Sequence, residues 1–110
     1  MSQRLHRHAK LLKALYKSGP TSRKNLLKKH CNKDFINCII ECVKNILNGN
    51  VRLSSAQKKR LSAKKNTLRQ IVLKKTPVGR KRQLIQSGGF LGALLGPIIS
   101  VLGGLFNGPR

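Results

Sequence analysis

Residues 32–48 read NKDFINCIIECVKNILN, and this stretch decides the fold. Asn32 is a favourable helix N-cap, and Gly49 follows the segment as a stop signal. Asp34 falls in the first turn, where a negative charge suits the helix dipole. The apolar residues cover more than one face, so residues 33–48 should be a buried hub for other helices; a surface for a partner or for self-association is the alternative. These apolar residues are Phe35, Ile36, Ile39, Ile40, Val43, Ile46 and Leu47.

The segments around this hub are basic and amphipathic. Apolar spacing predicts helices over roughly residues 3–17, 21–30 and 55–75. Gly19-Pro20 separates the first two, and Ser54 or Ser55 can cap the last. Strand signals are almost absent, so we predict an all-α fold: a small basic bundle of three to four short helices followed by a Gly-rich hydrophobic C-terminal segment. The first helix should turn inward Leu5, Leu12, Leu15 and Tyr16.

Charge divides the chain into unequal parts. Its 110 residues include 24 Lys and Arg but only 2 Asp and Glu, a formal net charge of +22. All of these except Arg110 lie within the first 82 positions. We therefore predict a basic helical domain (1–75), a basic linker (76–83) and a hydrophobic tail (84–110). With Asp34 and Glu41 as the only acids, we expect no carboxylate pair for glycoside chemistry and no oxygen cage for calcium or magnesium. We therefore expect a protein that binds polyanions, not an enzyme.

The basic residues predict contact with phosphate groups. Most are Lys and they occur on every basic helix, which favours neutralisation of the backbone over reading of base edges. Aromatic residues for stacking on single strands are scarce, so double-stranded DNA is the expected partner. A helix-turn-helix regulator at residues 3–30 is an alternative, although Gly19-Pro20 fits that turn poorly. The predicted contacts are Arg4, Arg7, Lys10, Lys13, Lys58, Lys59, Arg60, Lys64, Lys65, Arg69, Lys74, Lys75, Arg80, Lys81 and Arg82.

The three cysteines are expected to be buried and reduced. Cys31, Cys38 and Cys42 are odd in number, and the basic N-terminus does not look like a secretory signal. Their spacing matches no standard zinc site, and their neighbours in the sequence are aliphatic. We therefore predict no metal site and no cofactor. His6 and His8, among basic neighbours, are expected on the surface.

The tail contains a long uncharged run, residues 88–106. As a helix it would span about 28 Å, close to the thickness of a bilayer core. Three readings stay open: a membrane-active segment, a segment buried against a large partner such as a capsid wall, and a permanent anchor. The neighbouring basic residues could serve anionic lipid instead of DNA, which makes a membrane-lytic or tail-anchored protein the main alternative. The predicted contacts are Phe90, Leu91, Leu94, Leu95, Ile98, Ile99, Leu102, Leu105 and Phe106.

Arg80-Lys81-Arg82 leads into the Gly- and Pro-punctuated apolar run 88–99. In this respect the chain resembles the precursors of adenovirus core protein X (mu). The body, with LSSAQKKRL at 53–61, is similar to a small open reading frame of adintoviruses and Maverick/Polinton-type elements. The resemblance implies a non-enzymatic virion core protein that condenses DNA in the host nucleus, with a tail that contacts capsid or membrane. It also implies cleavage near Gly-Gly, at a site that residues 86–89 approximate, whereas the Lys-rich helical body departs from the short Arg-rich pattern.

Overall fold

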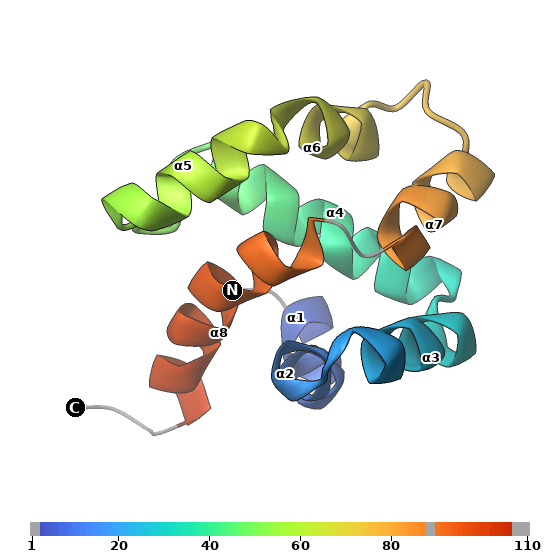
Figure 1. Ribbon diagram of the computed structural model, residues 1–110, viewed down its shortest axis with the longest axis horizontal. Coiled ribbons are helices and arrows are strands. Elements are labelled where there is room, and N and C mark those ends of the chain that lie inside the picture. Colours follow the sequence, from blue (N-terminus) through green and yellow to red (C-terminus); the bar gives the residue numbers. More distant parts are fainter. Residues whose placement is uncertain (1–2, 88–89, 107–110) are drawn as a thin grey trace.

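Helix α4 (Lys33–Leu47) is the element around which the others are arranged (Figure 1). The computed structural model describes residues 3–87 and 90–106, the last six by their backbone only. Asn32 Oδ1 accepts a hydrogen bond from the backbone N–H of Phe35 at 2.9 Å, which satisfies a donor left free at the helix start. Gly49 follows the end of α4 with a φ of 75°, a left-handed conformation that glycine adopts readily. Both ends of α4 agree with the prediction to within one residue.

Helix α4 is the predicted hub. Helices α1, α6, α7 and α8 pack against it. Exposed residues of α4 include Lys33, Lys44 and Leu47, whereas the buried side chains of the helix lie together on one broad face. The buried residues are Phe35, Ile36, Cys38, Ile39, Cys42, Val43 and Ile46.

The N-terminal segment forms two helices instead of one. Helix α1 (Gln3–Arg7) and helix α2 (Ala9–Lys17) are separated by a turn at His8. The turn allows α1 to pack on α4 while α2 packs on α3 (Pro20–His30) and α8. Leu5, Leu12 and Leu15 are buried as predicted, but Tyr16 is 47 % exposed. The expectation that Tyr16 belongs to the core is therefore wrong.

The predicted helix over residues 55–75 is also divided. Helix α5 (Ser55–Ala63) and helix α6 (Lys65–Val72) meet at Lys64. Ser54 and Gln57 form a capping box, in which each side chain bonds the backbone N–H of the other. Beyond the break, α6 packs on α4 and α7, whereas α5 packs on α8. Each half thus follows its own partner, which one straight helix could not do.

The range predicted as a linker, 76–83, is largely helical. Helix α7 (Val78–Ser87) begins just after Pro77 and packs on α3, α4 and α6. Ile85 is fully buried, so α7 contributes to the core. The turn signal Thr76-Pro77 is real, but it marks a tight connection between packed helices.

Helix α8 (Leu91–Phe106) accounts for most of the apolar tail. It runs from the middle of the molecule toward the C-terminus (Figure 1) and packs on α2, α4 and α5. Ile99 is partly buried in the same core, and the side chains of Leu102, Leu105 and Phe106 lie outside the described residues. Within the described ranges, no helix has the length and hydropathy needed to cross a bilayer. The predicted contact residues that the bundle itself buries are Phe90, Leu91, Leu94, Leu95 and Ile98.

The fold is all-α, as predicted, although its helices are shorter and more numerous than three or four. Eight helices and no strand occur in residues 3–87 and 90–106. The radius of gyration is 13.2 Å and the extents are 41 × 28 × 26 Å. A compact domain of this length has a radius of about 13 Å, and helix α8 is folded against the basic body.

Replacing Ile39 by Ala should lower the free energy of unfolding by about 2–5 kcal/mol, because Ile39 is fully buried in the hub. Leu47→Ala is the matched control, since Leu47 ends the same helix but is 44 % exposed. Urea titrations followed by circular dichroism compare the two. Equal losses would contradict the position of α4 at the centre of the fold.

A second substitution tests the docking of α8. Leu94→Ala should also cost about 2–5 kcal/mol, because Leu94 is fully buried although it belongs to the apolar tail. Leu73→Ala, at a position 42 % exposed, serves as the control. A tail that is independent of the bundle would instead leave the midpoint of urea unfolding unchanged in Leu94→Ala.

Candidate nucleic-acid interface

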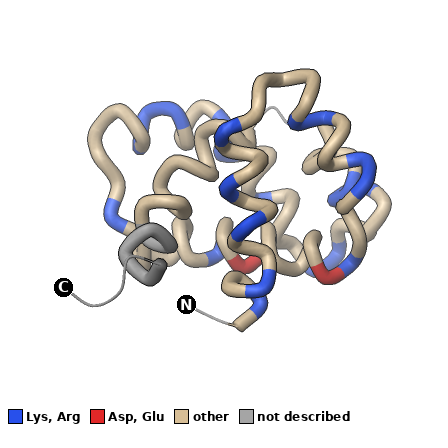
Figure 2. Tube along the Cα trace, turned by 90° about the horizontal axis from the view of Figure 1, so that it is seen from below, with Lys and Arg blue, Asp and Glu red and all other residues tan. Residues whose placement is uncertain are grey.

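Basic side chains are exposed on each of the helices α1 to α7. Figure 2 shows that Lys and Arg positions are distributed along the whole trace of the body. They do not gather on a single element. Both acidic residues, Asp34 and Glu41, belong to α4. The predicted contacts that are exposed are Arg7, Lys10, Lys58, Lys59, Arg60, Lys64, Lys65, Arg69, Lys74, Lys75 and Arg80.

The densest basic run follows α5, α6 and the connection after them. These helices are exposed over most of their surface because each buries so little: Leu61 in α5, and Leu68 and Ile71 in α6. A narrow inward stripe leaves the rest of each short helix to solvent. Lys58, Lys65 and the other basic residues of this run are therefore placed where a polyanion can reach them.

The block Arg80-Lys81-Arg82 is divided by the geometry of α7. Successive helical residues differ in direction by about 100°. Arg80 is exposed, Lys81 is only 8 % exposed, and Arg82 is half-buried. Arg82 Nε donates a hydrogen bond to the carbonyl oxygen of Cys31 at 3.2 Å, which ties α7 to the end of α3. Of these three predicted phosphate contacts, the folded protein therefore exposes Arg80, whereas Lys81 is buried and Arg82 has a structural bond.

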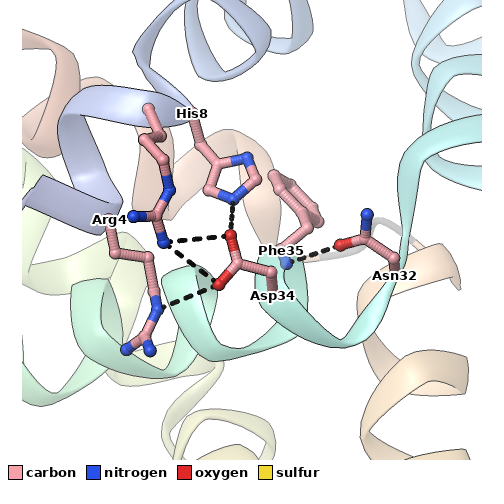
Figure 3. A network of polar contacts seen from close by, with 6 residues as sticks. Arg4, His8, Asn32, Asp34 and Phe35 are labelled. Carbon is pink, nitrogen blue, oxygen red and sulfur yellow. Dashed lines mark hydrogen bonds and ion pairs between the residues drawn. The ribbon is translucent and has the colours of Figure 1, made fainter.

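Arg4 and Arg7 of α1 face the carboxylate of Asp34 at the start of α4 (Figure 3). Arg4 Nε and Arg7 Nη2 each lie 3.3 Å from Asp34 Oδ1. His8 Nε2 lies 2.8 Å from Asp34 Oδ2, and it must donate, because a carboxylate only accepts. The network fixes the short helix α1 on α4.

His8 is not the surface residue that its basic neighbours suggested. Its side chain is only 16 % exposed, and its ring stands edge-on to that of Phe35, with centroids 5.6 Å apart. The residue occupies the turn between α1 and α2, so the break in the helix brings its ring to Asp34. Arg4 is likewise half-buried. Both residues therefore have a structural role, since they hold α1 against α4 through Asp34.

The pKa of Asp34 is lowered from its ordinary value. The hydrogen bond from His8 has the largest effect, burial opposes it, and Arg7 and Arg4 lower the pKa further. The carboxylate is therefore negative over the physiological range. The chain has only two acidic residues. One of them, Asp34, pairs with the cations of α1 and so offsets positive charge only there. No acidic residue occurs in α3, α5, α6 or α7, so their positive charge is not offset within their own sequence.

Arg23, which is not among the predicted contacts, has a structural role that the sequence did not indicate. Arg23 of α3 donates from Nε to the carbonyl of Leu15 at 3.2 Å and from Nη2 to that of Ser18 at 3.3 Å. It therefore caps the last turn of α2. The bonds are to main-chain atoms, which leave no signal in a sequence. Several other exposed basic residues are also missing from the predicted contacts, although their charge could have identified them. They are Lys17, Lys24, Lys28, Lys29, Lys33, Lys44 and Arg52.

The cysteines are buried, as predicted. Burial raises the pKa of the Cys31 thiol, an effect that nearby Arg82 partly opposes. Cys38 and Cys42, one turn apart on α4, are fully buried; a hydrogen bond with Cys38 and then burial raise the pKa of Cys42. The raised pKa keeps the thiols of Cys31 and Cys42 protonated, whereas a metal binds the thiolate. In residues 3–87 and 90–106, no group of three or more His, Cys, Asp or Glu is arranged to hold a metal ion.

No family model, curated protein or solved structure matches this chain.

The Asp34 network predicts a pH dependence. Because the pKa of Asp34 is lower in the folded protein than in the unfolded chain, the network stabilises the fold above the ordinary aspartate pKa of 3.8. The stabilisation is lost as the pH falls through the lower folded-state value. Asp34→Asn should therefore unfold at less urea than the wild type at pH 7, and this gap should close under strongly acidic conditions. A gap that persists in acid would show that the carboxylate charge is not what matters.

Proposed function

We propose that this protein is a non-enzymatic, sequence-independent binder of double-stranded DNA that condenses it by neutralising phosphates. The observation that supports the proposal most directly is the exposure of basic side chains on all seven helices of the body. Phosphate contacts of this kind fix a protein on a duplex without reading its sequence. Counterion release then provides the main driving force for binding.

The exposed residue types favour duplex over single-stranded nucleic acid. Proteins that bind single strands place a series of aromatic rings along a groove. Of the aromatic residues in the body, Phe35 is buried and Tyr16 alone is exposed. One ring cannot stack successive bases, whereas cations on several faces can contact phosphates from neighbouring duplex segments.

A folded core strengthens the case for condensation. Repulsion among so many like charges opposes compaction, and the apolar core around α4 works against it. A bound polyanion removes this repulsion, so DNA should stabilise the fold as it binds. The protein then acts as a rigid cationic body that can bridge duplexes, because its charged residues are held apart on different helices.

The position of α8 bears on the proposed role of the tail. The resemblance of the chain to adenovirus core protein X precursors supports the proposal that the protein belongs to a virion core formed in a host nucleus. In that proposal the tail contacts capsid proteins or membrane. Phe90, Leu91 and Leu94 are, however, buried in the protein's own core. Contact of these residues with a capsid wall or a bilayer would require α8 to leave the bundle. We therefore assign DNA binding to the folded state and any tail contact to a state in which α8 is released.

Binding should be indifferent to sequence and very sensitive to salt. If about eight phosphates are engaged, the plot of log affinity against log salt concentration should have a slope near −7. Fluorescence anisotropy with two unrelated duplexes of equal length measures both properties. A thousandfold preference for one duplex would instead favour the helix-turn-helix reading of α2 and α3.

The membrane alternative requires a separate measurement. Vesicles of anionic lipid loaded with dye should stay intact when the full chain is added, because α8 is packed in the bundle. Leu94→Ala, which loosens that packing, is the matched comparison. Efficient dye release by the wild type, together with weak DNA binding, would overturn the proposed function in favour of a membrane-lytic protein.

A further inference from the structure

Two arginine side chains from different helices converge over Gly92 of α8. A Cβ atom built on Gly92 would lie 3.6 Å from Arg23 Nη1 and 3.7 Å from Arg60 Nη2. The two guanidinium groups, from α3 and α5, therefore lie within 4 Å of one point. One turn further along α8, Gln57 of α5 approaches Gly96 in the same way, at 3.8 Å. The glycines of α8 thus leave the space into which side chains of α5 extend.

The Arg23 side chain is held in place before any ligand binds. Its Nε and Nη2 bond the last carbonyls of α2, so its remaining terminal nitrogen, Nη1, is the one directed toward Gly92. Arg60 of α5 is an exposed residue. One guanidinium is fixed by the fold and the other can adjust, an arrangement suited to grasping an anion from solvent.

The pair has no carboxylate to balance it. The chain has two acidic residues: Asp34 is held by Arg4 and His8, and Glu41 lines a hollow with Arg4 and Lys44. Among the described residues, the side chain of Arg60 makes no hydrogen bond or ion pair. Two cations this close repel each other, and an anion placed between them would relieve the repulsion.

We propose that Arg23 and Arg60 form a phosphate-binding site over Gly92, and that its ligand is a phosphodiester group of the nucleic-acid backbone. The inference rests on the proposed function and adds a defined contact to it. Two guanidinium groups can present several N–H donors to the oxygens of one phosphate. The site would hold the junction of α3, α5 and α8 against the duplex, whereas the exposed lysines act as separate point charges.

The test compares substitutions that remove the same charge. Arg60→Gln removes one side of the site, and Arg69→Gln removes an exposed arginine of α6 that lies outside it. Anisotropy with duplex DNA should show a loss of affinity of about tenfold in Arg60→Gln, the scale of one charge-assisted hydrogen bond. Arg69→Gln should lose clearly less. Equal losses in the two variants would overturn the site and leave non-specific binding in place.

A second measurement does not depend on DNA. Inorganic phosphate should raise the melting temperature of the wild type above its value in sodium chloride of equal ionic strength. The increment should persist in Arg69→Gln and disappear in Arg60→Gln and in Gly92→Ala, whose methyl group would occupy the point between the guanidinium groups. Gly92→Ala keeps both charges and has room for its Cβ, so it also controls for lost charge and for misfolding.

The DNA measurement and the phosphate measurement together distinguish failure of the proposed function from failure of the proposed site. A wild type that fails to bind duplex DNA but shows the phosphate increment would overturn the proposed function, and with it the nucleic-acid ligand, while it would uphold the anion site. A wild type that binds DNA, with the same phosphate increment in all variants, would overturn the site alone. A loss of binding to anionic vesicles but not to DNA in Arg60→Gln would show that the ligand is a lipid phosphate, contrary to the proposal.

Discussion

The burial of apolar side chains around α4 has to overcome the mutual repulsion of a chain with a net charge of +22. Nearly every other feature of the structure is related either to this burial or to this repulsion. The helices are short and carry narrow apolar stripes, so each can reach the core while its cations remain in water. The chain has very little negative charge with which to reduce the repulsion. It places both acids on the central helix, where Asp34 attracts cations from α1.

The apolar C-terminal helix follows from the same balance. Helices α1 to α7 bury few large side chains outside α4, and a domain of this size is marginally stable even without excess charge. Helix α8 supplies Leu91, Leu94, Leu95 and Ile98, and Phe90 just before it is buried in the same core as Leu12 and Leu61. The segment that most resembles a membrane peptide is thus also the segment that completes the bundle. Folding and any activity of the tail outside the bundle therefore compete for the same side chains.

Local signals predicted the parts of the fold that depend on neighbours in sequence. The Asn32 cap, the extent of α4, the Ser54 cap of α5 and the buried cysteines could all be recognised in advance. The breaks at His8 and Lys64 could not, because they occur where consecutive segments pack on helices distant in sequence. Helix α8 gave no indication of its packing face, since its apolar residues leave no polar stripe to define one.

The candidate interface divides in the same way. The exposure of Lys58, Arg69 and their neighbours was predictable, because long charged side chains avoid the interior. The inward turn of Lys81 was not, since it depends on the angle at which α7 packs. Arg23 was missed because its bonds are to main-chain carbonyls. Tertiary structure thus selects, from many equivalent basic residues, the few that have a defined position.

The dimensions of the folded body have a consequence for stoichiometry. Duplex DNA carries one negative charge for about every 1.7 Å of its axis, so 22 phosphates occupy about 37 Å. The longest dimension of the protein is 41 Å. Copies laid lengthwise in single file along a duplex would therefore match its linear charge density almost one for one. No second layer of protein would be needed to bring such a fibre close to electrical neutrality.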